Sequence, residues 1–361
     1  MPFTKYIRGS SLAYLYLNQN MNQFQLSICI ATLNRASFLQ ETLDTILAQT
    51  NDEIEIVIVD GASTDNTSEV VKKAAERFNR LRYLRLERKG GIDNDYCKAV
   101  ELAQGKYVWL FTDDDLLKPG TIKAILESTR KDYSLIIINA EVRTKNLDIC
   151  LQPLRVELTE NRVYGSNIPD RNHLLADIGG YLSFIGAVVI KREIWLQREK
   201  EKYFGTEFIH MGVIFQSPLP SDTLMMAFPW IIIRYGNAQW VSRSFKIWMF
   251  NWPDLIWSFP DFADWAKKKI APREPWQSYS QLIFLRAQGR FSIIEYNSIL
   301  VGKICSPFRR FITQLIATAP IRLLNFFARY YARWILRKVP SIGLYELETW
   351  HKDINSSLVS N

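Results

Sequence analysis

Short apolar segments typical of β-strands alternate with amphipathic segments through the first 140 residues of this 361-residue chain. Apolar residues recur at helical spacing over 38–49 and 67–78, whereas the runs at 26–31, 54–59 and 106–111 are short and rich in β-branched or aromatic residues. Repeated strand–helix–strand units place parallel strands side by side, because each helix returns the chain to the same end of the sheet. The pattern therefore predicts an α/β fold with a mostly parallel sheet and helices on both faces.

A polar cluster directly follows each of four strands expected in this region. The carboxyl ends of parallel strands meet at one edge of a sheet, and ligands of open α/β sheets bind beyond that edge. We therefore expect the four loops to form one site. The clusters occupy residues 32–35, 60–66, 90–95 and 113–115.

The last cluster consists of three consecutive carboxylates, Asp113, Asp114 and Asp115, after the apolar run 107–111. Adjacent like charges raise one another's pKa unless a cation lies among them. Mg²⁺ and Mn²⁺ prefer carboxylate oxygens together with substrate phosphates. The triplet therefore predicts a divalent metal ion that holds a phosphorylated ligand. A solvated turn that caps the next helix is the alternative.

The positive charge of the chain is concentrated near its end. The formal net charge is +8, and the segment from Lys303 to Lys338 contains eight Lys or Arg and no Asp or Glu. The rest of the chain is therefore neutral overall. Within this segment we expect an amphipathic basic helix at about 321–339, between two prolines. Its polar stripe is formed by Arg322, Asn325, Arg329, Arg333 and Arg337, and its apolar face by Leu323, Leu324, Phe327, Tyr331, Trp334 and Ile335.

A basic stripe beside a broad apolar face is typical of a helix at an anionic lipid surface. Nucleic acid also binds basic and aromatic residues, but this apolar face is too large for a helix that reads a groove. We therefore expect an anionic membrane surface as partner, and no nucleic acid. A helix packed on the rest of the protein with a solvated Arg face is the alternative.

Three further features of the sequence limit which class of protein this can be. The four Cys are far apart and match no zinc-binding spacing, which favours a reducing compartment. No apolar run reaches the roughly 18 residues that a membrane-spanning helix needs. Residues 1–23 lack the core of a signal peptide, and we expect them to be a disordered N-terminal extension or a misread upstream start.

Taken together, these motifs resemble family 2 glycosyltransferases of the GT-A fold over about residues 26–140. The resemblance depends on residues 28–35, 58–67 and 112–115. The second half resembles the abequosyltransferase-like branch, which is similar to enzymes that add a dideoxyhexose from a CDP-sugar during O-antigen assembly. The segments that carry this second resemblance are 181–186, 208–216 and 233–238.

The resemblance implies a Rossmann-like GT-A domain over 24–240, with a nucleotide-binding half (24–140) and an acceptor half (141–240). Residues 241–361 then form a helical, basic C-terminal region. It implies an inverting, metal-dependent glycosyltransferase that uses Mn²⁺ or Mg²⁺ and a CDP-, UDP- or GDP-linked sugar. We expect a lipid-linked oligosaccharide as acceptor and a cytoplasmic, peripheral location on the inner face of the cell membrane.

The resemblance also assigns roles to individual residues of this sequence. It puts Asp60 near the nucleobase, Asp93 in a loop that closes on the nucleotide and ribose, Asp113 on the ribose side and Asp115 on the metal, although three consecutive Asp leave the register open by one residue. The other donor-side contacts that we expect are Thr32, Asn34, Arg35, Asp114 and Arg234. Each has an ordinary structural alternative. Asp60, Asp93 and Asp95 are suited to capping the helices that follow them, and Arg35 to a solvated loop.

An inverting transferase needs a base that removes the proton of the acceptor hydroxyl. The resemblance places an acidic residue after a small-residue turn in the second half, which points to Glu207. His210 would share a helical face with it. His210 could otherwise contact metal or phosphate, Asp222 is the fallback base, and a surface Glu with a core His is the alternative.

Two functions other than glycosyl transfer are alternatives for this sequence. A nucleotidyltransferase that makes an activated sugar would need a Gly-rich loop with a basic residue after the first strand, and residues 32–35 lack it. A non-catalytic, membrane-associated assembly partner would not need the carboxylates at 113–115.

Overall fold

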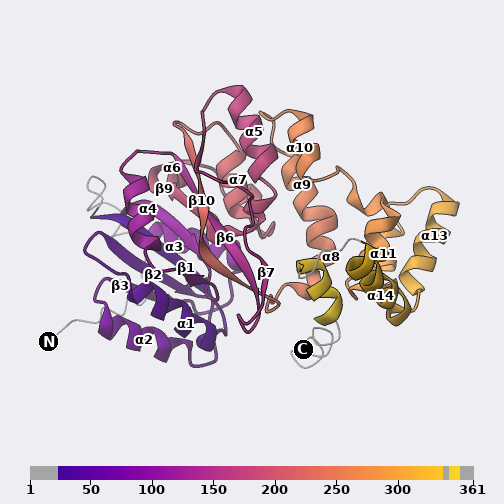
Figure 1. Ribbon diagram of the computed structural model, residues 1–361, viewed down its shortest axis with the longest axis horizontal. Helices are drawn as coiled ribbons and strands as arrows, with labels where there is room; N and C mark the ends of the chain where they lie inside the picture. The colour runs from indigo at the N-terminus through magenta and orange to yellow at the C-terminus, as the bar shows by residue number, and fades with distance from the viewer. Residues whose placement is uncertain (1–22, 336–340, 350–361) are drawn as a thin grey trace.

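The computed structural model describes residues 23–335 and 341–349 of the chain, shown as coloured ribbon in Figure 1. The predictions for residues 1–22 and for the end of the 321–339 helix, at 336–339, lie outside this part. Residues 350–361 of the expected C-terminal region also lie outside it.

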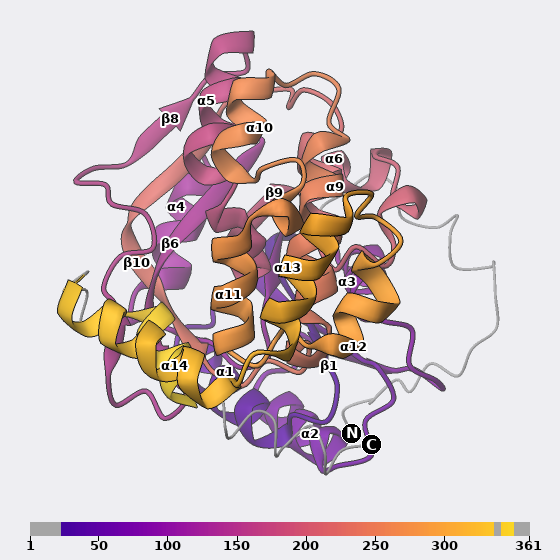
Figure 2. The ribbon, with the colours of Figure 1, turned by 90° about the vertical axis from the view of Figure 1, so that its right-hand side faces the viewer.

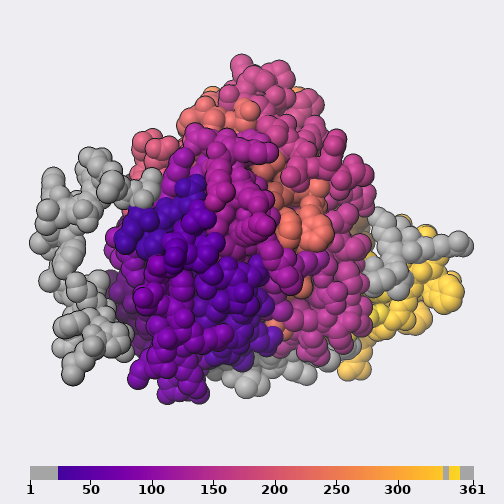
Figure 3. All heavy atoms as spheres, turned by 60° about the vertical axis from the view of Figure 1, so that its left-hand side comes forward, coloured from indigo at the N-terminus to yellow at the C-terminus, as the bar shows by residue number. Residues whose placement is uncertain are grey.

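The first half of the chain builds a parallel sheet with the order β3-β2-β1-β4. Thr32 pairs with Asp60, and Ile30 pairs with Phe111, so the strands end close together at one edge. This half forms much of the face in Figure 3, in indigo to magenta. Its elements are β1 (Phe24–Thr32), α1 (Ala36–Leu47), β2 (Ile54–Asp60), α2 (Thr67–Arg77), β3 (Leu81–Arg85), α3 (Ile92–Leu102) and β4 (Gly105–Phe111).

The second half extends the same sheet in the order β4-β9-β6-β10-β5, so that ten strands of the described chain form one sheet. Strand β9 is antiparallel to both neighbours, whereas β10 is parallel to β6. The elements are β5 (Leu116–Leu117), α4 (Thr121–Thr129), β6 (Leu135–Thr144), β7 (Cys150–Gln152), β8 (Arg162–Tyr164), α5 (Ile168–Ile178), β9 (Val188–Lys191), α6 (Arg192–Gln197), α7 (Ile209–Phe215) and β10 (Thr223–Tyr235). The mostly parallel α/β sheet predicted from the sequence is confirmed.

The sequence suggests a strand over 181–190, but most of this segment is not one. Residues Tyr181–Ser183 and Ile185–Ala187 form 3₁₀ turns, and only β9 pairs with the sheet. Tertiary contacts favour the turns, because the Tyr181 hydroxyl donates to the Ile138 carbonyl and the Trp109 indole donates to the Gly186 carbonyl. An apolar run alone cannot show that choice.

Helices form the C-terminal region, at the end of the molecule away from α2 (Figure 1). Buried side chains from 245–317 make a second hydrophobic cluster beside the main one, which reaches Ala271. In Figure 2, α11, α13 and α14 lie side by side towards the viewer. The helices are α8 (Ser244–Lys246), α9 (Trp252–Trp257), α10 (Asp264–Ile270), α11 (Tyr279–Ala287), α12 (Ile293–Glu295), α13 (Pro307–Thr318) and α14 (Ile321–Tyr330), followed by a π-helical turn at Tyr331–Ile335 and a helix at 342–349.

None of the described helices is by itself long and apolar enough to cross a membrane. The pair Pro307–Thr318 and Ile321–Ile335 has the length and composition together, but it is bent by 87°.

Helix α14 departs from the usual placement of polar and apolar side chains. Asn325 of α14 is buried and donates to the carbonyls of Ala287 and Leu347, so the inward side of this helix carries a polar residue. Large apolar residues point outward instead. The exposed set is Phe308, Phe311, Leu315, Leu323, Phe326, Phe327, Tyr330, Tyr331, Trp334 and Ile335, which we call the aromatic surface.

Candidate functional site

Three carboxylates meet at the carboxyl end of β4, where the strand pattern places them. Asp113 and Asp115 are buried, and Asp114 is partly exposed. Arg35, from the loop after β1, lies between two of them: its Nε is 3.1 Å from Asp113 Oδ1 and its Nη2 pairs with Asp114. The structure therefore brings together residues from two of the four predicted loops.

Asp115 is only 2% exposed, and each oxygen of its carboxylate accepts a hydrogen bond. The Arg234 amide donates to Asp115 Oδ1 at 2.8 Å, and the Thr112 hydroxyl donates to Oδ2. The guanidinium of Arg234 also donates to the Asp114 carbonyl at 3.0 Å and pairs with Glu41. Arg234 comes from β10, so the second half of the chain completes the cluster.

Negative charge exceeds positive charge in this cluster. The cluster holds four carboxylates and two guanidinium groups: Arg35 pairs with Asp113 and Asp114, Arg234 pairs with Glu41, and Asp115 accepts from the backbone amide of Arg234 and the Thr112 hydroxyl. Burial raises the pKa of Asp113, which Arg35 opposes. Burial and the Asp114 charge raise the pKa of Asp115 well above its ordinary value. Two excess negative charges remain when all four carboxylates are ionised, which a divalent cation would balance.

The donor set suits a hard cation, since all its side-chain ligands are carboxylate oxygens. Among the described residues, however, no group of three or more His, Cys, Asp or Glu side chains is arranged to hold a metal ion. The residues fit a Mg²⁺-type ion that takes one or two carboxylates and completes its shell with water and substrate phosphate.

The loops after β1 and β2 are joined by polar contacts. Asn34 has φ +54° and accepts a hydrogen bond from the Thr64 amide, while its own amide donates to Ser63. Asp60 is fully buried and accepts from the Ser63 amide at 2.7 Å and the Tyr83 hydroxyl at 2.6 Å. Asn34 and Asp60 thus hold the loops in shape, as capping residues do.

Asp93 connects the two halves of the chain. It is 3% exposed and accepts hydrogen bonds from the amides of Gly205, Glu207 and Ile209, at 2.8, 3.0 and 3.2 Å. Both oxygens are therefore occupied by backbone. A loop more than 100 residues away thus holds this carboxylate, and the expected contact with the nucleotide and its ribose stays a prediction.

Glu207 lies in the loop that Asp93 holds. Its backbone has φ +68°, a conformation that costs a non-glycine residue free energy and is found preferentially at functional sites. Its carboxylate pairs with Arg243 of the 3₁₀ turn Val241–Arg243. Burial raises the pKa of Glu207, against the opposing effect of Arg243.

Comparison with known proteins identifies the domain that carries the first part of this site. Residues 27–185 match the family model of glycosyl transferase family 2. The chain contains a family 2 glycosyltransferase domain. Abequosyltransferase RfbV of Salmonella typhimurium is 32% identical over 207 residues, which are 54% of this chain and 62% of that protein. A GalNAc(5)-diNAcBac-PP-undecaprenol beta-1,3-glucosyltransferase of Campylobacter jejuni is 27% identical over 51% of this chain and 57% of its own length.

The chain thus spans less than two thirds of the length of these curated relatives. Solved structures support the fold of the glycosyltransferase domain. Residues 1–349 of S. aureus TarS superpose with a TM-score of 0.52 at 16% identity, covering 91% of this chain and 92% of that one. The same protein in complex with UDP-GlcNAc gives a TM-score of 0.53 at 14% identity over the same shares.

His210, expected beside Glu207 as a second catalytic group, lies on α7 between Ile209 and Met211 of the main hydrophobic cluster. It is 1% exposed, and its Nε2 is 2.6 Å from the Leu182 carbonyl. Burial lowers the pKa of His210 to about 4, so the ring is neutral at pH 7. The contacts are those of a core histidine, and they give no support to a catalytic role.

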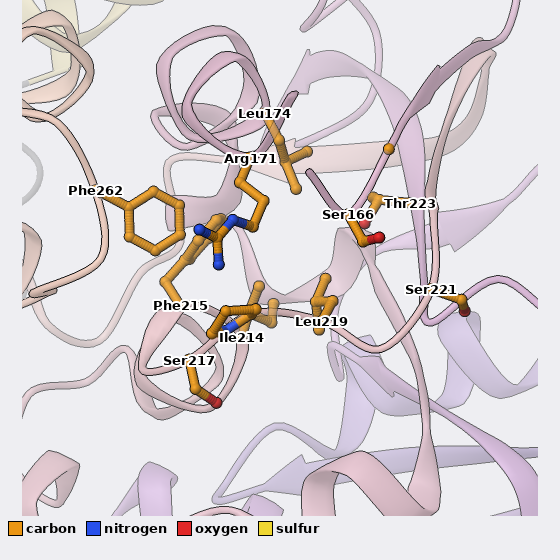
Figure 4. Close-up of a pocket in the computed structure, with 12 residues that line it drawn as sticks. Ser166, Arg171, Leu174, Ile214, Phe215, Ser217, Leu219, Ser221, Thr223 and Phe262 are labelled. Carbon is orange, nitrogen blue, oxygen red and sulfur yellow. The ribbon is translucent and has the colours of Figure 1, made fainter. Parts of the chain in front are cut away.

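Asp222, the fallback base, is exposed and precedes the first residue of β10. Arg234 lies eleven residues beyond Thr223 on that strand, about 35 Å along an extended chain. The pocket in Figure 4 is at the same amino end, lined by Arg171, Phe215 and Thr223 among others. Neither belongs to the carboxylate cluster.

The sequence predicts Asp95 to be a helix cap, and the structure gives it a different setting. It is 5% exposed, and its Oδ1 accepts no hydrogen bond from any described residue. Burial raises the pKa of Asp95 to about 6, and the Asp60 charge adds to this effect. The signal in the sequence was a second acidic residue after the two glycines at 90 and 91, and spacing alone cannot distinguish a cap from an open acceptor.

Proposed function

We propose that this chain is an inverting glycosyltransferase that transfers a sugar from a nucleotide donor to a hydroxyl of a lipid-linked glycan. The observation that carries the proposal is the surplus of buried carboxylate at 113–115, placed at the strand ends of a family 2 glycosyltransferase domain. A buried group of like charges is stabilised by nearby cations and otherwise takes up protons, and here the two arginines do not balance all the carboxylates. A donor that arrives as a nucleoside diphosphate with a divalent metal ion meets this requirement.

Asp113 and Asp115 would hold Mn²⁺ or Mg²⁺, together with the diphosphate of the donor. When bound, such an ion offsets the charge that develops on the departing diphosphate. Asp115 is positioned for this task by the Arg234 amide and the Thr112 hydroxyl, and each of its oxygens keeps a lone pair. Arg35 and Arg234 add fixed positive charge beside the leaving group.

Glu207 is the base that we propose for the acceptor hydroxyl. A general base must be ionised when it removes the proton, and a raised pKa improves its basicity near neutral pH. Burial raises the pKa of Glu207 in this direction. Asp93 is a positioning residue in this scheme, since its contacts to three backbone amides hold the loop that carries Glu207.

The aromatic surface supports a peripheral site on the cytoplasmic face of a membrane. Phe308 is 70% exposed and Trp334 is 68% exposed, and such large apolar side chains usually mark an interaction surface when they cluster. Arg322 and Arg333 are exposed on the same helical segment. Aromatic insertion together with Arg–headgroup attraction is how an interfacial helix binds an anionic bilayer. A lipid-linked acceptor, as named for the Campylobacter relative, would lie on that surface.

The donor that we favour is a CDP-linked dideoxyhexose, in the assembly of O-antigen or another surface polysaccharide. The name of the Salmonella relative, an abequosyltransferase, supports this choice. UDP-linked and GDP-linked sugars are the other donor classes, and the experiment below includes both.

The test is donor hydrolysis by the purified full chain. The protein is incubated with CDP-, UDP- and GDP-sugars, each with Mn²⁺, with Mg²⁺ or with chelator, and the released nucleoside diphosphate is measured. We expect release from one nucleotide class, dependent on the metal ion. Silence with every donor and metal would overturn the proposal and favour a non-catalytic assembly partner. Formation of a nucleotide sugar from a nucleoside triphosphate and a sugar phosphate would instead identify a sugar-activating nucleotidyltransferase.

A further inference from the structure

Arg35 supplies the positive charge that two carboxylates of the site meet. Its Nε lies 3.1 Å from Asp113 Oδ1 and its Nη2 pairs with Asp114, and the three side chains are 11%, 11% and 16% exposed. Among the described residues, Arg35 is the one ion-pair partner of Asp113. A buried carboxylate without a cation is costly, so this guanidinium stabilises the oxygens that the proposed metal ion would take.

The guanidinium of Arg35 also has partners that are not carboxylates. Its Nη1 donates to the Asn237 carbonyl at 3.1 Å, and its Cζ lies 5.0 Å from the centre of the Phe38 ring. A guanidinium over a ring face is attracted by the negative charge of that face. These two contacts do not involve Asp113 or Asp114. Arg35 can therefore stay beside the site while its Nε and Nη2 exchange one set of oxygens for another.

Arg35 and a metal ion compete for the same carboxylates. Like charges repel at short range, so the guanidinium opposes a divalent cation that approaches Asp113 and Asp114 without other ligands. Arg234, whose Cζ lies 5.1 Å from the same Phe38 ring, adds to this opposition. The diphosphate of a donor changes the balance, because its oxygens can accept from both arms of an arginine fork as a carboxylate does.

We propose that Arg35 makes metal binding depend on the donor, so that the site takes a divalent cation tightly only together with a nucleoside diphosphate. Nε and Nη2 of Arg35 then donate to the diphosphate, and the carboxylates that they release meet the metal ion. This inference rests on the proposed function, because it assumes that a metal ion and a diphosphate share the site. Arg35 is the residue that couples the two ligands, and such coupling is reciprocal.

The experiment is binding of Mn²⁺ alone to the full chain and to Arg35→Gln at pH 8, with free Mn²⁺ measured by electron paramagnetic resonance. Gln removes the charge and keeps a polar side chain. We expect Arg35→Gln to bind Mn²⁺ at least about tenfold more tightly than the wild type, because the competing cation is gone. Arg77→Gln is the matched control, since it removes an arginine of α2 that pairs with Asp44, and it should leave this affinity unchanged.

Two further measurements separate charge from the shape of the site. Arg35→Lys keeps the positive charge without the arginine fork, so its affinity for Mn²⁺ alone should stay near that of the wild type. If Arg35→Gln melts at a lower temperature, Mn²⁺ should raise its melting temperature more than that of the wild type, because a ligand stabilises the state that binds it.

The coupling itself is measured by calorimetric titration of CDP, UDP and GDP, each with Mn²⁺ and with chelator. In the wild type, Mn²⁺ should raise the affinity for the nucleotide that the site accepts. In Arg35→Gln this gain should be at least about tenfold smaller, because no guanidinium has to be taken over by the diphosphate. A gain of equal size in both proteins would overturn the inference.

The other outcomes distinguish this inference from the proposed function. Unchanged or weaker Mn²⁺ binding in Arg35→Gln would overturn the inference alone, and Arg35 would then be a structural partner of the carboxylates. Equally tight Mn²⁺ binding in Arg35→Lys and Arg35→Gln would also overturn it, because charge would not be the cause. No binding of any nucleotide to the wild type would overturn both. The expected Mn²⁺ results without release of nucleotide from any donor sugar would overturn only the proposed function.

Discussion

The carboxyl edge of the sheet and the aromatic surface both depart from the ordinary division between a buried apolar core and a polar surface, in opposite ways. At the carboxyl edge of the sheet, Asp113, Asp115 and Asp95 are buried although they are acidic. On the C-terminal helices, Phe326 and Trp334 are exposed although they are large and apolar. Folded proteins ordinarily avoid both arrangements, since buried charges lose hydration and exposed apolar groups order water.

The difference between the two regions indicates what each one lacks. Buried carboxylates lack positive charge and hydrogen-bond donors, which a small ligand with its metal ion supplies. Exposed aromatics lack an apolar environment, which requires an extended surface such as a bilayer. The first region should therefore respond to changes in charge and pH, and the second to changes in apolar area. The predictions below test that division.

The largest effect is expected at Asp115. Asp115→Asn keeps an oxygen that can accept from the Arg234 amide but removes the charge that would meet the metal ion. We expect donor turnover to fall about 10³-fold, with little change in melting temperature. Asp44→Asn, which removes an exposed carboxylate of α1, is the control. Normal turnover in Asp115→Asn would remove the metal role from this residue.

The fold of the nucleotide-binding half could be predicted because its signals are local. Strands β1, β2 and β4 are short, mostly apolar segments, and the carboxylates of 113–115 follow soon after β4. Residues close in sequence specify both the element and the loop at its end. The position of the Asp triplet at the sheet edge follows from topology alone.

The partners of the site residues could not be predicted, because they come from distant parts of the chain. The loop held by Asp93 begins 112 residues later, and Arg234 is 119 residues from Asp115. No spacing rule relates such pairs. The same limit applies to α14, where helical periodicity shows two faces but not which one packs inward. Asn325 faces inward because Ala287 and Leu347 offer it carbonyl oxygens.

Glu207 provides the second prediction, which concerns charge at the site. Glu207→Gln cannot accept the acceptor's proton, and we expect kcat to fall about 10²-fold or more. Arg243→Gln tests whether the charge of Arg243 acts on the base, because Arg243 opposes the rise in the pKa of Glu207. Its loss raises that pKa further, so the acid limb of the pH profile of kcat/KM should move to higher pH. An unmoved limb would show that another group is the base.

The aromatic surface should respond to apolar area. Phe326 and Phe327 are both exposed on α14, and replacing both with Ser removes side chains that each contribute about 1.5–3 kcal/mol when fully buried in an apolar phase. Binding to vesicles with anionic lipid, measured by sedimentation, should fall at least about tenfold. Phe228→Ser on β10 removes an equally exposed aromatic outside this surface and should have no effect. Equal loss in both variants would contradict a lipid role for α14.

The smallest effect is a pH-dependent gain in stability at Asp95. Burial and Asp60 raise the pKa of Asp95 to about 6, above the ordinary value of a carboxylate in the unfolded chain. Between these two values the folded state binds more protons, so the Asp95 contribution to stability falls as pH rises and is least favourable above pH 6.

Asp95→Asn removes this penalty. Its melting temperature, measured without nucleotide, should exceed that of the wild type by a few degrees at pH 7.5 and by about half as much at pH 5, which lies midway between the two pKa values. Comparing the two proteins at each pH cancels the titration of the other groups, including Asp60 and Lys89. A gain of equal size at both values would mean that the carboxylate is not desolvated. Asp95 would then belong with ordinary surface carboxylates, and the contrast between a charge-deficient site and an apolar surface would no longer extend to it.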